Sequence, residues 1–359
     1  MKIAIYGAGE YGKAFFNALK EKNMEVAYFI DQYTTRKQLM GVQIFNIEHI
    51  EDKSIKIYVS VGLNDSGTIP EFLKRNGFRN IISFTESLLE IKTCLYHLMK
   101  TNILWMRKNN VEYFDNNAIE KLFLLLSDQR SRDILKNIIN FRKTLSFDYY
   151  VYPDENIQYF PNDINLFNNI KHLNFVDCGG FIGDTVQETL KYCKNNDIVV
   201  NNIISFEADS KNILKLNNEI SQQRKNNQNI NFTIYPAGVW NQNTILHFSN
   251  DGDSASAIVE KSKNTIAIPV FSLDSTISNI SINYVKMDIE GAEREAIRGM
   301  KNILLEQSPI LAICLYHNPR DLWEIPLLIN NINPNYNMYI RVYGHLFLET
   351  VLYCIPKRD

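Results

Sequence analysis

The sequence has few cysteines, almost no net charge and no long apolar run. Its 359 residues include five cysteines, an odd number, and no pair has the C-x-x-C spacing of a zinc or redox site. The 38 basic and 40 acidic residues give a net charge of −2, which offers no basic face to a nucleic acid. No apolar run approaches the roughly 20 residues of a spanning helix, and the N-terminus does not resemble a signal peptide. We therefore expect a cytoplasmic protein without disulfides, structural zinc, nucleic-acid partners or a transmembrane segment.

The hydrophobic pattern predicts an α/β protein of two or three parts. Strands and helices alternate in both terminal regions, as in parallel sheets with crossover helices, whereas the middle lacks glycine and proline and shows helical spacing. We expect two Rossmann-like parallel-sheet domains in series, at residues 1–85 and 166–359. A helical connector and an aromatic loop over 86–165 would join them. Within it, residues 148–165 form either a substrate-facing lid or an ordinary packed loop.

The first glycine turn, G-A-G-E-Y-G, places Gly7, Gly9 and Gly12 between a predicted strand and a predicted helix. Such glycines permit a tight turn, the approach of a phosphate and close packing of the helix on the strand. The first N–H groups of the helix can bind an anion, and Asp31 ends the next predicted strand, where an acid can bind a ribose. The pattern favours either a working nucleotide site or a fold kept without a ligand.

The segment at residues 29–50, FIDQYTTRKQLMGVQIFNIEHI, resembles the N-terminal domain of bacterial sugar O-acyltransferases that handle UDP-amino sugars. That resemblance implies a nucleotide-sugar or nucleotide ligand in preference to NAD. No pattern in the first hundred residues indicates a hydride-transfer site. An NAD(P)-dependent oxidoreductase and a non-catalytic nucleotide-sugar-binding protein are the alternative functions that this turn leaves open.

The second glycine turn, VDCGGFIGDT, also joins a predicted strand to a predicted helix but departs from the dinucleotide pattern. Here Asp177 precedes the turn glycines Gly179, Gly180 and Gly183. An acid in this place suits the cationic part of a ligand, with the glycines letting the backbone approach it. Glu207 ends the next predicted strand, where a carboxylate can accept both hydroxyls of a ribose.

These residues, with YVKMDIEGAEREAIRG, AICLYHNPRDLWEIP and the ending HLFLETVLYCIP, resemble the FkbM family of S-adenosylmethionine-dependent methyltransferases. The resemblance covers about Asn165–Pro356 and implies a class I methyltransferase fold. It also implies methyl transfer to a sugar or natural-product hydroxyl, often in bacterial surface polysaccharide synthesis. The acceptor would be a small molecule or a glycan, and a nucleotide sugar is one candidate. The cofactor-binding residues that it implies are Asp177, Gly179, Gly180, Gly183, Asp184, Thr185, Glu207, Asp209, Gly238, Val239 and Asp288.

Methyl transfer to a hydroxyl needs alignment of donor and acceptor and removal of the acceptor proton. His317, in YHNP after a predicted strand, is the candidate general base by residue type, or else a structural histidine. Asp288 and Glu290 are further catalytic candidates. The role of a helix N-terminal acid fits Glu290 equally well, and it fits Glu293 better than a catalytic role does. Asp288, Glu290 and His317 could alternatively hold a divalent cation that polarises the acceptor. Asp251 and Asp253 lack the remainder of a calcium loop.

Overall fold

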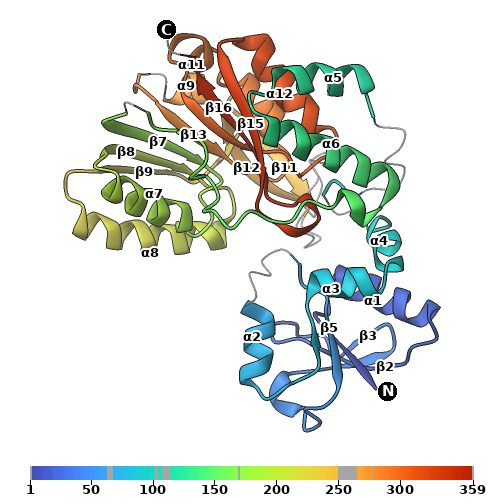
Figure 1. Cartoon of the computed structure of the whole chain (residues 1–359). Coiled ribbons are helices and arrows are strands. Elements are labelled where there is room, and N and C mark those ends of the chain that lie inside the picture. Colours follow the sequence, from blue (N-terminus) through green and yellow to red (C-terminus); the bar gives the residue numbers. More distant parts are fainter. Residues whose placement is uncertain are drawn as a thin grey trace. The chain divides into compact units, whose positions relative to one another are not determined.

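The computed structural model describes residues 2–62, 68–101, 104–106, 114–168, 170–249, 265–277 and 279–357. The chain forms two compact units (Figure 1). The first unit contains Met1–Phe114, Ile134–Asp154 and Val342–Leu348, and the second contains Asp115–Asp133, Glu155–Arg341 and Glu349–Asp359. Each unit therefore combines segments that lie far apart in the sequence. The two aspartates of the loop NDGDSAS, Asp251 and Asp253, lie outside the described residues.

The first unit is built on a six-stranded sheet with the order β3-β4-β2-β1-β5-β6, in which only β3 runs antiparallel to its neighbour. The predicted strand–helix alternation is present, and a short β3–β4 hairpin is added to it. The strand expected at residues 80–84 is shorter, because Ser83 and Glu86 form a capping box that starts a helix. The elements are β1 (Ile3–Tyr6), α1 (Glu10–Glu21), β2 (Val26–Ile30), β3 (Gln38–Leu39), β4 (Val42–Phe45), η1 (Ile47–His49), β5 (Lys56–Val59), α2 (Thr68–Arg75), β6 (Ile81–Ile82), α3 (Phe84–Glu90) and α4 (Thr93–Leu98).

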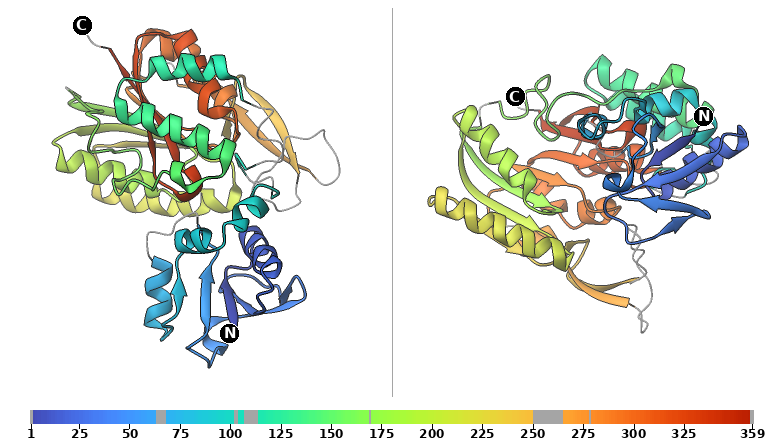
Figure 2. Two further views of the ribbon diagram at one scale, coloured as in Figure 1. Left: turned by 45° about the vertical axis from the view of Figure 1, so that its right-hand side comes forward. Right: turned by 90° about the horizontal axis from the view of Figure 1, so that it is seen from below.

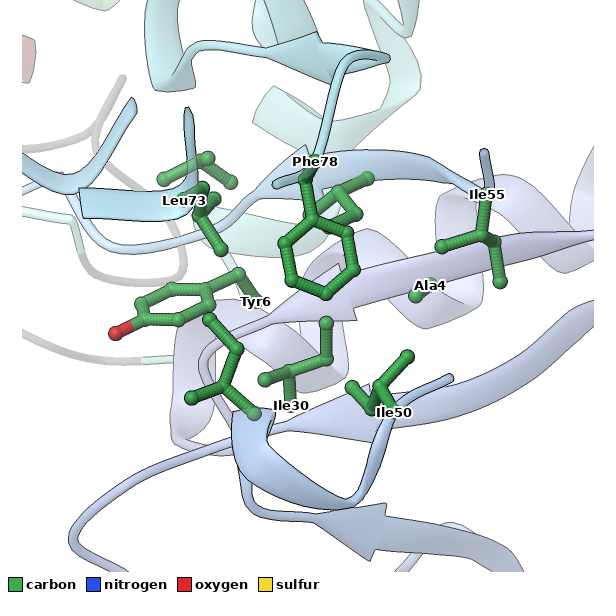
Figure 3. Close-up of a cluster of buried hydrophobic side chains, with 10 residues drawn as sticks. Ala4, Tyr6, Ile30, Ile50, Ile55, Leu73 and Phe78 are labelled. Atoms are coloured by element: carbon green, nitrogen blue, oxygen red, sulfur yellow. The ribbon is translucent and has the colours of Figure 1, made fainter. Parts of the chain in front are cut away.

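One face of this sheet carries a continuous apolar core (Figure 3). Tyr6 and Ile30 come from the neighbouring strands β1 and β2, and Leu73 and Phe78 cover them from α2 and the turn after it. Every other residue of a strand points to the same face, so the short apolar strands supply this core and also the opposite one beneath α1. On α1 the buried residues follow the predicted helical stripe.

Distant segments complete the first unit through an aromatic cluster. Phe141 packs edge-on against Phe347, with ring centroids 4.9 Å apart, and Trp105 Nε1 donates a hydrogen bond to the Leu346 carbonyl. His345 Nδ1 lies 3.0 Å from the Tyr150 hydroxyl. These contacts tie residues 342–348 to the first unit, although the strands on either side belong mainly to the second. The elements concerned are α6 (Gln129–Thr144), η3 (Phe147–Tyr149) and η4 (His345–Phe347).

The second unit is built on a seven-stranded sheet with the order β15-β16-β14-β13-β7-β8-β9. The strands from β14 through β9 are parallel, and β16 pairs antiparallel with β14. Both faces are covered, which explains why β13 and β14 are buried along their whole length. The strands are β7 (His172–Cys178), β8 (Val199–Phe206), β9 (Asn231–Tyr235), β13 (Tyr284–Met287), β14 (Ile310–Cys314), β15 (Tyr336–Val342) and β16 (Thr350–Pro356).

The strand order reverses at β7, because β8 lies on one side of it and β13 on the other. In open α/β sheets, ligands bind beyond the carboxyl ends of the strands at such a switch point. Figure 1 shows α7 and α8 together on one face of β7, β8 and β9. The helices of this unit are α5 (Asn116–Leu125), α7 (Asp184–Asn195), α8 (Ser210–Asn226), α9 (Leu273–Thr276), α10 (Glu293–Arg298), α11 (Lys301–Glu306) and α12 (Asp321–Ile332).

A small three-stranded sheet was not expected from the sequence. β10 (Gly238–Val239) pairs in parallel with β12 (Thr265–Phe271), and β11 (Thr244–Ser249) pairs antiparallel with β12. Figure 2 shows the β11–β12 hairpin as a separate ribbon beside the larger sheet. No helix that the structure describes is long and apolar enough to cross a membrane.

Candidate active site

A buried ion pair lies at the switch point. Asp177 on β7 and Lys286 on β13 are partners in the strand register, and Lys286 Nζ lies 3.0 Å from Asp177 Oδ1. Lys286 also donates a 2.6 Å hydrogen bond to the Gly179 carbonyl. Apart from this pairing, neither carboxylate oxygen of Asp177 accepts a hydrogen bond from the described part of the chain. The sequence indicated the acid but not its lysine partner.

Burial raises the pKa of Asp177 to about 6, although the charge of Lys286 acts in the opposite direction. For Lys286, burial alone would lower the pKa, but the carboxylates of Asp177 and Asp288 raise it above the ordinary value. Lys286 is therefore a permanent buried cation at neutral pH, and it holds the acid end of β7 against the glycine turn.

The second glycine turn follows the ion pair directly. Gly179 has a φ of +86°, and a Cβ added there would overlap the carbonyl oxygen of Asp288. Gly183 has a φ of +91° and is the N-cap of α7, where no side chain caps the helix. A Cβ added to Gly180 would lie 3.1 Å from the Leu216 side chain and 3.2 Å from that of Ser205, which is closer than most side-chain contacts. Glycine is required here for the backbone conformation and for close packing.

Two acidic residues that follow β8, Glu207 and Asp209, accept hydrogen bonds from the backbone around the second glycine turn and the start of α8. Glu207 follows β8 and accepts hydrogen bonds from the Phe181 N–H at 2.8 Å and the Asp209 N–H at 2.7 Å. Asp209 caps α8 by accepting from Lys211 and Asn212, and its side chain is exposed. A carboxylate has about four lone-pair positions, so Glu207 keeps capacity for further donors.

The other predicted cofactor residues flank these two strand ends. Asp184 and Thr185 begin α7, and Asp184 Oδ1 accepts from the Thr185 N–H. Gly238 and Val239 form β10, and a Cβ on Gly238 would lie 4.0 Å from the Ala208 Cβ. The structure thus gathers the turn after β7, the end of β8 and the start of β10.

Asp288 lies immediately beyond β13 and is the centre of a hydrogen-bonded cluster. Its backbone N–H donates to the Cys178 carbonyl, which seats it beside the end of β7. Tyr159 donates its hydroxyl to Oδ2 at 3.0 Å, and Tyr316 donates to Oδ1 at 3.2 Å. Although burial opposes its ionisation, the charges of His317 and Lys286 lower the pKa of Asp288. The side chain remains 22% exposed, so it is accessible at the edge of the sheet.

His317 is buried between carboxylates. Its Nδ1 lies 2.9 Å from Glu293 Oε1 and its Nε2 lies 3.4 Å from Asp288 Oδ1. Burial alone would lower the pKa of His317, but Glu293 and then Asp288 raise it to about 10. The imidazole is therefore protonated at neutral pH and cannot accept a proton. This state is the opposite of the one that a general base requires.

The two glutamates of the IEGAE segment occupy different environments. Glu293 is fully buried at the start of α10, and besides facing His317 it accepts from the Ile289 N–H. Glu290 has a φ of +56° and a side chain that is 69% exposed, with Oε2 3.7 Å from His317 Nε2. Glu293 therefore lies closer to the His317 ring than Glu290 does, at 2.9 Å against 3.7 Å.

Two groups of side chains have atoms close enough to hold a metal ion, within 4.8 Å of one another. One is Asp288, Glu293 and His317, and the other is Asp288, Cys314 and Glu349. The trio named from the sequence contained Glu290 in place of Glu293. Tyr159 lies in the aromatic loop and Glu349 in the segment HLFLETVLYCIP, but neither was named as a site residue, because residue spacing does not show that they reach Asp288.

At the first glycine turn, the carboxylate of Asp31 accepts hydrogen bonds from the protein's own backbone. Asp31 Oδ2 accepts from the Ala8 N–H at 2.8 Å, and Oδ1 accepts from the N–H groups of Tyr33 and Thr34. A Cβ on Gly12 would overlap the Gly7 carbonyl oxygen, as close packing of helix and strand requires. A Cβ on Gly9 would meet nothing within 4 Å. Gly9 is also the N-cap of α1, where no side chain caps the helix.

Comparison with known proteins agrees with this arrangement. Residues 177–345 match the protein family described as the methyltransferase FkbM domain. The fold is similar to that of methyltransferase FkbM from Methylobacillus flagellatus KT, with a TM-score of 0.66 and 20% identity over 98% of this chain and 89% of that one. No curated protein matches the chain. Residues 177–345 therefore match the methyltransferase FkbM domain, the family that the sequence motifs resemble.

Proposed function

We propose that the protein is an S-adenosylmethionine-dependent O-methyltransferase that acts on a sugar hydroxyl. The observation that carries this proposal is the buried carboxylate of Asp177, which accepts no hydrogen bond from the described chain apart from its pairing with Lys286. It stands at the switch point of the sheet, directly before a glycine turn. Buried polar atoms are rarely left without partners, so this carboxylate suits a donor from a ligand.

The residues present fit S-adenosylmethionine, which methyltransferases of this family generally use. Asp177 and the turn through Gly183 would hold its amino-acid part, with the uncapped start of α7 beside them. Glu207 would accept from the ribose hydroxyls, and Gly238 at the start of β10 would lie beside the adenine. Asp288 would face the reacting end of the ligand. When bound, the cofactor supplies an electrophilic methyl group on a sulfonium.

The polar cluster around Asp288 supports a hydroxylic acceptor. Two tyrosine hydroxyls and an imidazolium surround one accessible carboxylate. Burial raises the pKa of both Tyr159 and Tyr316 well above the ordinary value, so they remain donors at neutral pH. Aromatic rings with polar edges suit the faces and hydroxyls of sugars. A role in bacterial surface-glycan or natural-product synthesis in the cytoplasm is part of this proposal and rests on the sequence resemblance.

Calorimetric titration with S-adenosylmethionine and S-adenosylhomocysteine tests the cofactor assignment. Asp177→Asn should weaken binding by roughly 10- to 100-fold, since a hydrogen bond to a charged group contributes about 1.5–3 kcal/mol. Asp197→Asn, at an exposed turn residue after α7, is the matched control and should bind as the wild type does. Absence of binding to the wild type, or equal binding by Asp177→Asn, would contradict the proposal.

We further propose that the first unit binds a nucleotide sugar at the turn of Gly7, Gly9 and Gly12. The open space beside Gly9 and the uncapped start of α1 support a phosphate there. The carboxylate of Asp31 already accepts hydrogen bonds from three backbone N–H groups, so its main role would be to position the turn and not to bind a ribose. Titration with UDP-N-acetylglucosamine and with NAD tests this proposal. Binding of NAD alone would favour the oxidoreductase alternative, and binding of neither would indicate a purely structural turn.

A further inference from the structure

A cavity of about 320 Å³ lies in the second unit, at the sheet edge opposite to the one that carries Asp288. Ile310, the first residue of β14, and Ile355, near the end of the antiparallel β16, line this cavity. Cys314, at the other end of β14, is the residue that lies close to Asp288. The four residue steps from Ile310 to Cys314 span about 13 Å along the strand. The cavity is therefore separate from the site around Asp288.

The lining of the cavity combines apolar and polar side chains. The β14–β16 register, in which Leu311 pairs with Cys354, continues to Ile310 and Ile355, and these two isoleucines supply apolar surface. Asn337 and Tyr339 also line the cavity, and they share one face of β15 because they are two residues apart. Apolar surface with a few polar groups is the usual composition of a small-molecule site.

The polar side chains of the lining are available to a ligand. Asn165, Asn337 and Tyr339 line the cavity, and their side chains make no hydrogen bond to any described residue. A carboxamide carries both donors and an acceptor, and a tyrosine hydroxyl donates and accepts. Groups of this kind match ligand hydroxyls, which also donate and accept.

Asp163 adds a carboxylate with one available oxygen. Arg341 Nη2 and Arg130 Nη1 each lie 2.7 Å from Asp163 Oδ2, whereas no described group donates to Oδ1. Although burial opposes ionisation, Arg341 and then Arg130 lower the pKa of Asp163. Arg341 is itself buried and also pairs with Asp128 at 2.7 Å. Two arginines thus balance two aspartates beside the cavity, and Oδ1 remains as an acceptor.

The charges indicate a neutral ligand. None of the described residues that line the cavity is a lysine or an arginine, and Arg130 and Arg341 already contact carboxylates. Proteins bind phosphate with such cations or with the N–H groups of a helix start. A nucleotide or a nucleotide sugar would therefore lack a partner for its phosphates here. A neutral sugar has hydroxyls for the carboxamides, Tyr339 and Asp163, and C–H groups for the isoleucines.

We propose that this cavity is a second saccharide-binding site, which holds a neutral sugar at the sheet edge opposite to Asp288. Asp163 and Asn165 end the aromatic loop, and Tyr159 of the same loop donates to Asp288. A sugar in the cavity would thus hold the segment that also reaches the other sheet edge. The binding needs no sulfonium cofactor, so it is independent of the proposed function.

Methyl NMR of the full chain, labelled at its isoleucine methyl groups, locates a bound sugar without S-adenosylmethionine. The probes are glucose, galactose, mannose and N-acetylglucosamine, with uridine and inorganic phosphate as other ligand classes. At least one sugar should shift the Ile310 and Ile355 signals with a dissociation constant in the millimolar range, as expected for a ligand of about a dozen heavy atoms. Ile289, beside Asp288, should not shift. Shifts at Ile289 alone, shifts by uridine or phosphate but by no sugar, or no shift with any sugar overturn the proposal.

Two variants of β15 test the polar lining. Asn337→Leu and Tyr339→Phe, at half-buried positions, should each weaken sugar binding by about 2- to 10-fold, the effect of one lost hydrogen bond. Asn218→Leu, at an exposed residue of α8, is the matched control and should bind the sugar as the wild type does. Circular dichroism checks that each variant folds. Unchanged sugar affinity in both β15 variants overturns the proposal, whereas failure of the wild type to bind S-adenosylmethionine refutes only the proposed function.

Discussion

Replacing Lys286 by methionine should destabilise the protein strongly, because it leaves Asp177 charged in a fully buried site. Asp177 is completely buried and has no other partner among the described residues, and the Gly179 carbonyl also loses its donor. Breaking a buried ion pair by removing one member costs about 3–5 kcal/mol. That loss is a large fraction of the roughly 5–15 kcal/mol by which a typical domain is stable.

The pH dependence of this loss follows from the protonation of Asp177. Its pKa in the folded wild type is about 6, and removing Lys286, whose charge lowers it, should raise it further. An unfolded aspartate has a pKa of about 3.9. A carboxyl with a higher pKa in the folded state stabilises the fold while protonated, and this contribution disappears as the pH rises through the folded value. The cost of Lys286→Met should therefore be smallest near pH 4 and largest near pH 8.

Urea unfolding followed by circular dichroism at pH 4, 6 and 8 measures these free energies. The matched control is the double variant Asp177→Asn with Lys286→Met, in which no buried charge remains unpaired. It should recover most of the stability lost at pH 8, because replacing both members of a buried pair is often nearly neutral. A loss below about 1 kcal/mol for Lys286→Met at pH 8, or a loss that does not change with pH, would refute this reasoning.

Three further outcomes are expected. Gly179→Ala should lower the free energy of unfolding in urea by more than about 4 kcal/mol, since the new Cβ would overlap the Asp288 carbonyl. Gly41→Ala is the control, with a φ of +79° and open space around the new Cβ, and should lower it by about 1–2 kcal/mol. His317→Gln should remove stability on the order of 5 kcal/mol, which Glu293 provides by holding the imidazolium and which the wild type has below pH 6.5 and loses toward pH 10. Equal pH profiles of stability for the wild type and the variant would contradict this. EDTA should leave methyl transfer unchanged, because protein donors already contact the carboxylates of Asp288 and Glu293. Loss of activity that a divalent cation restores would show a metal role.

The sequence predicted the strand–helix alternation and both glycine turns, because these depend on local period and on glycine. It also placed Asp288 and His317 at one sheet edge, since the carboxyl ends of parallel strands meet there. The small sheet was missed, because β10 has only two residues and neither β11 nor β12 was predicted as a strand.

The partners within the site could not be predicted. Tyr159 and Glu349 belong to segments that the sequence singled out, but only the fold brings their side chains to Asp288. The protonation of His317 depends on the 2.9 Å approach of Glu293, a distance that residue spacing does not determine. Lys286 lies within the KMDIEGAE motif, yet its role appears only when the register sets it beside Asp177.

The first unit is discontinuous, and this limits how the chain can be divided. Residues 342–348 pack with Phe84, Phe141 and Trp105, which are contributed by segments hundreds of residues earlier or by the middle of the chain. A truncated chain that begins near residue 166 would keep the methyltransferase motifs but expose the apolar side chains of Leu346 and Phe347. Aggregation of such a fragment would then report the loss of this packing.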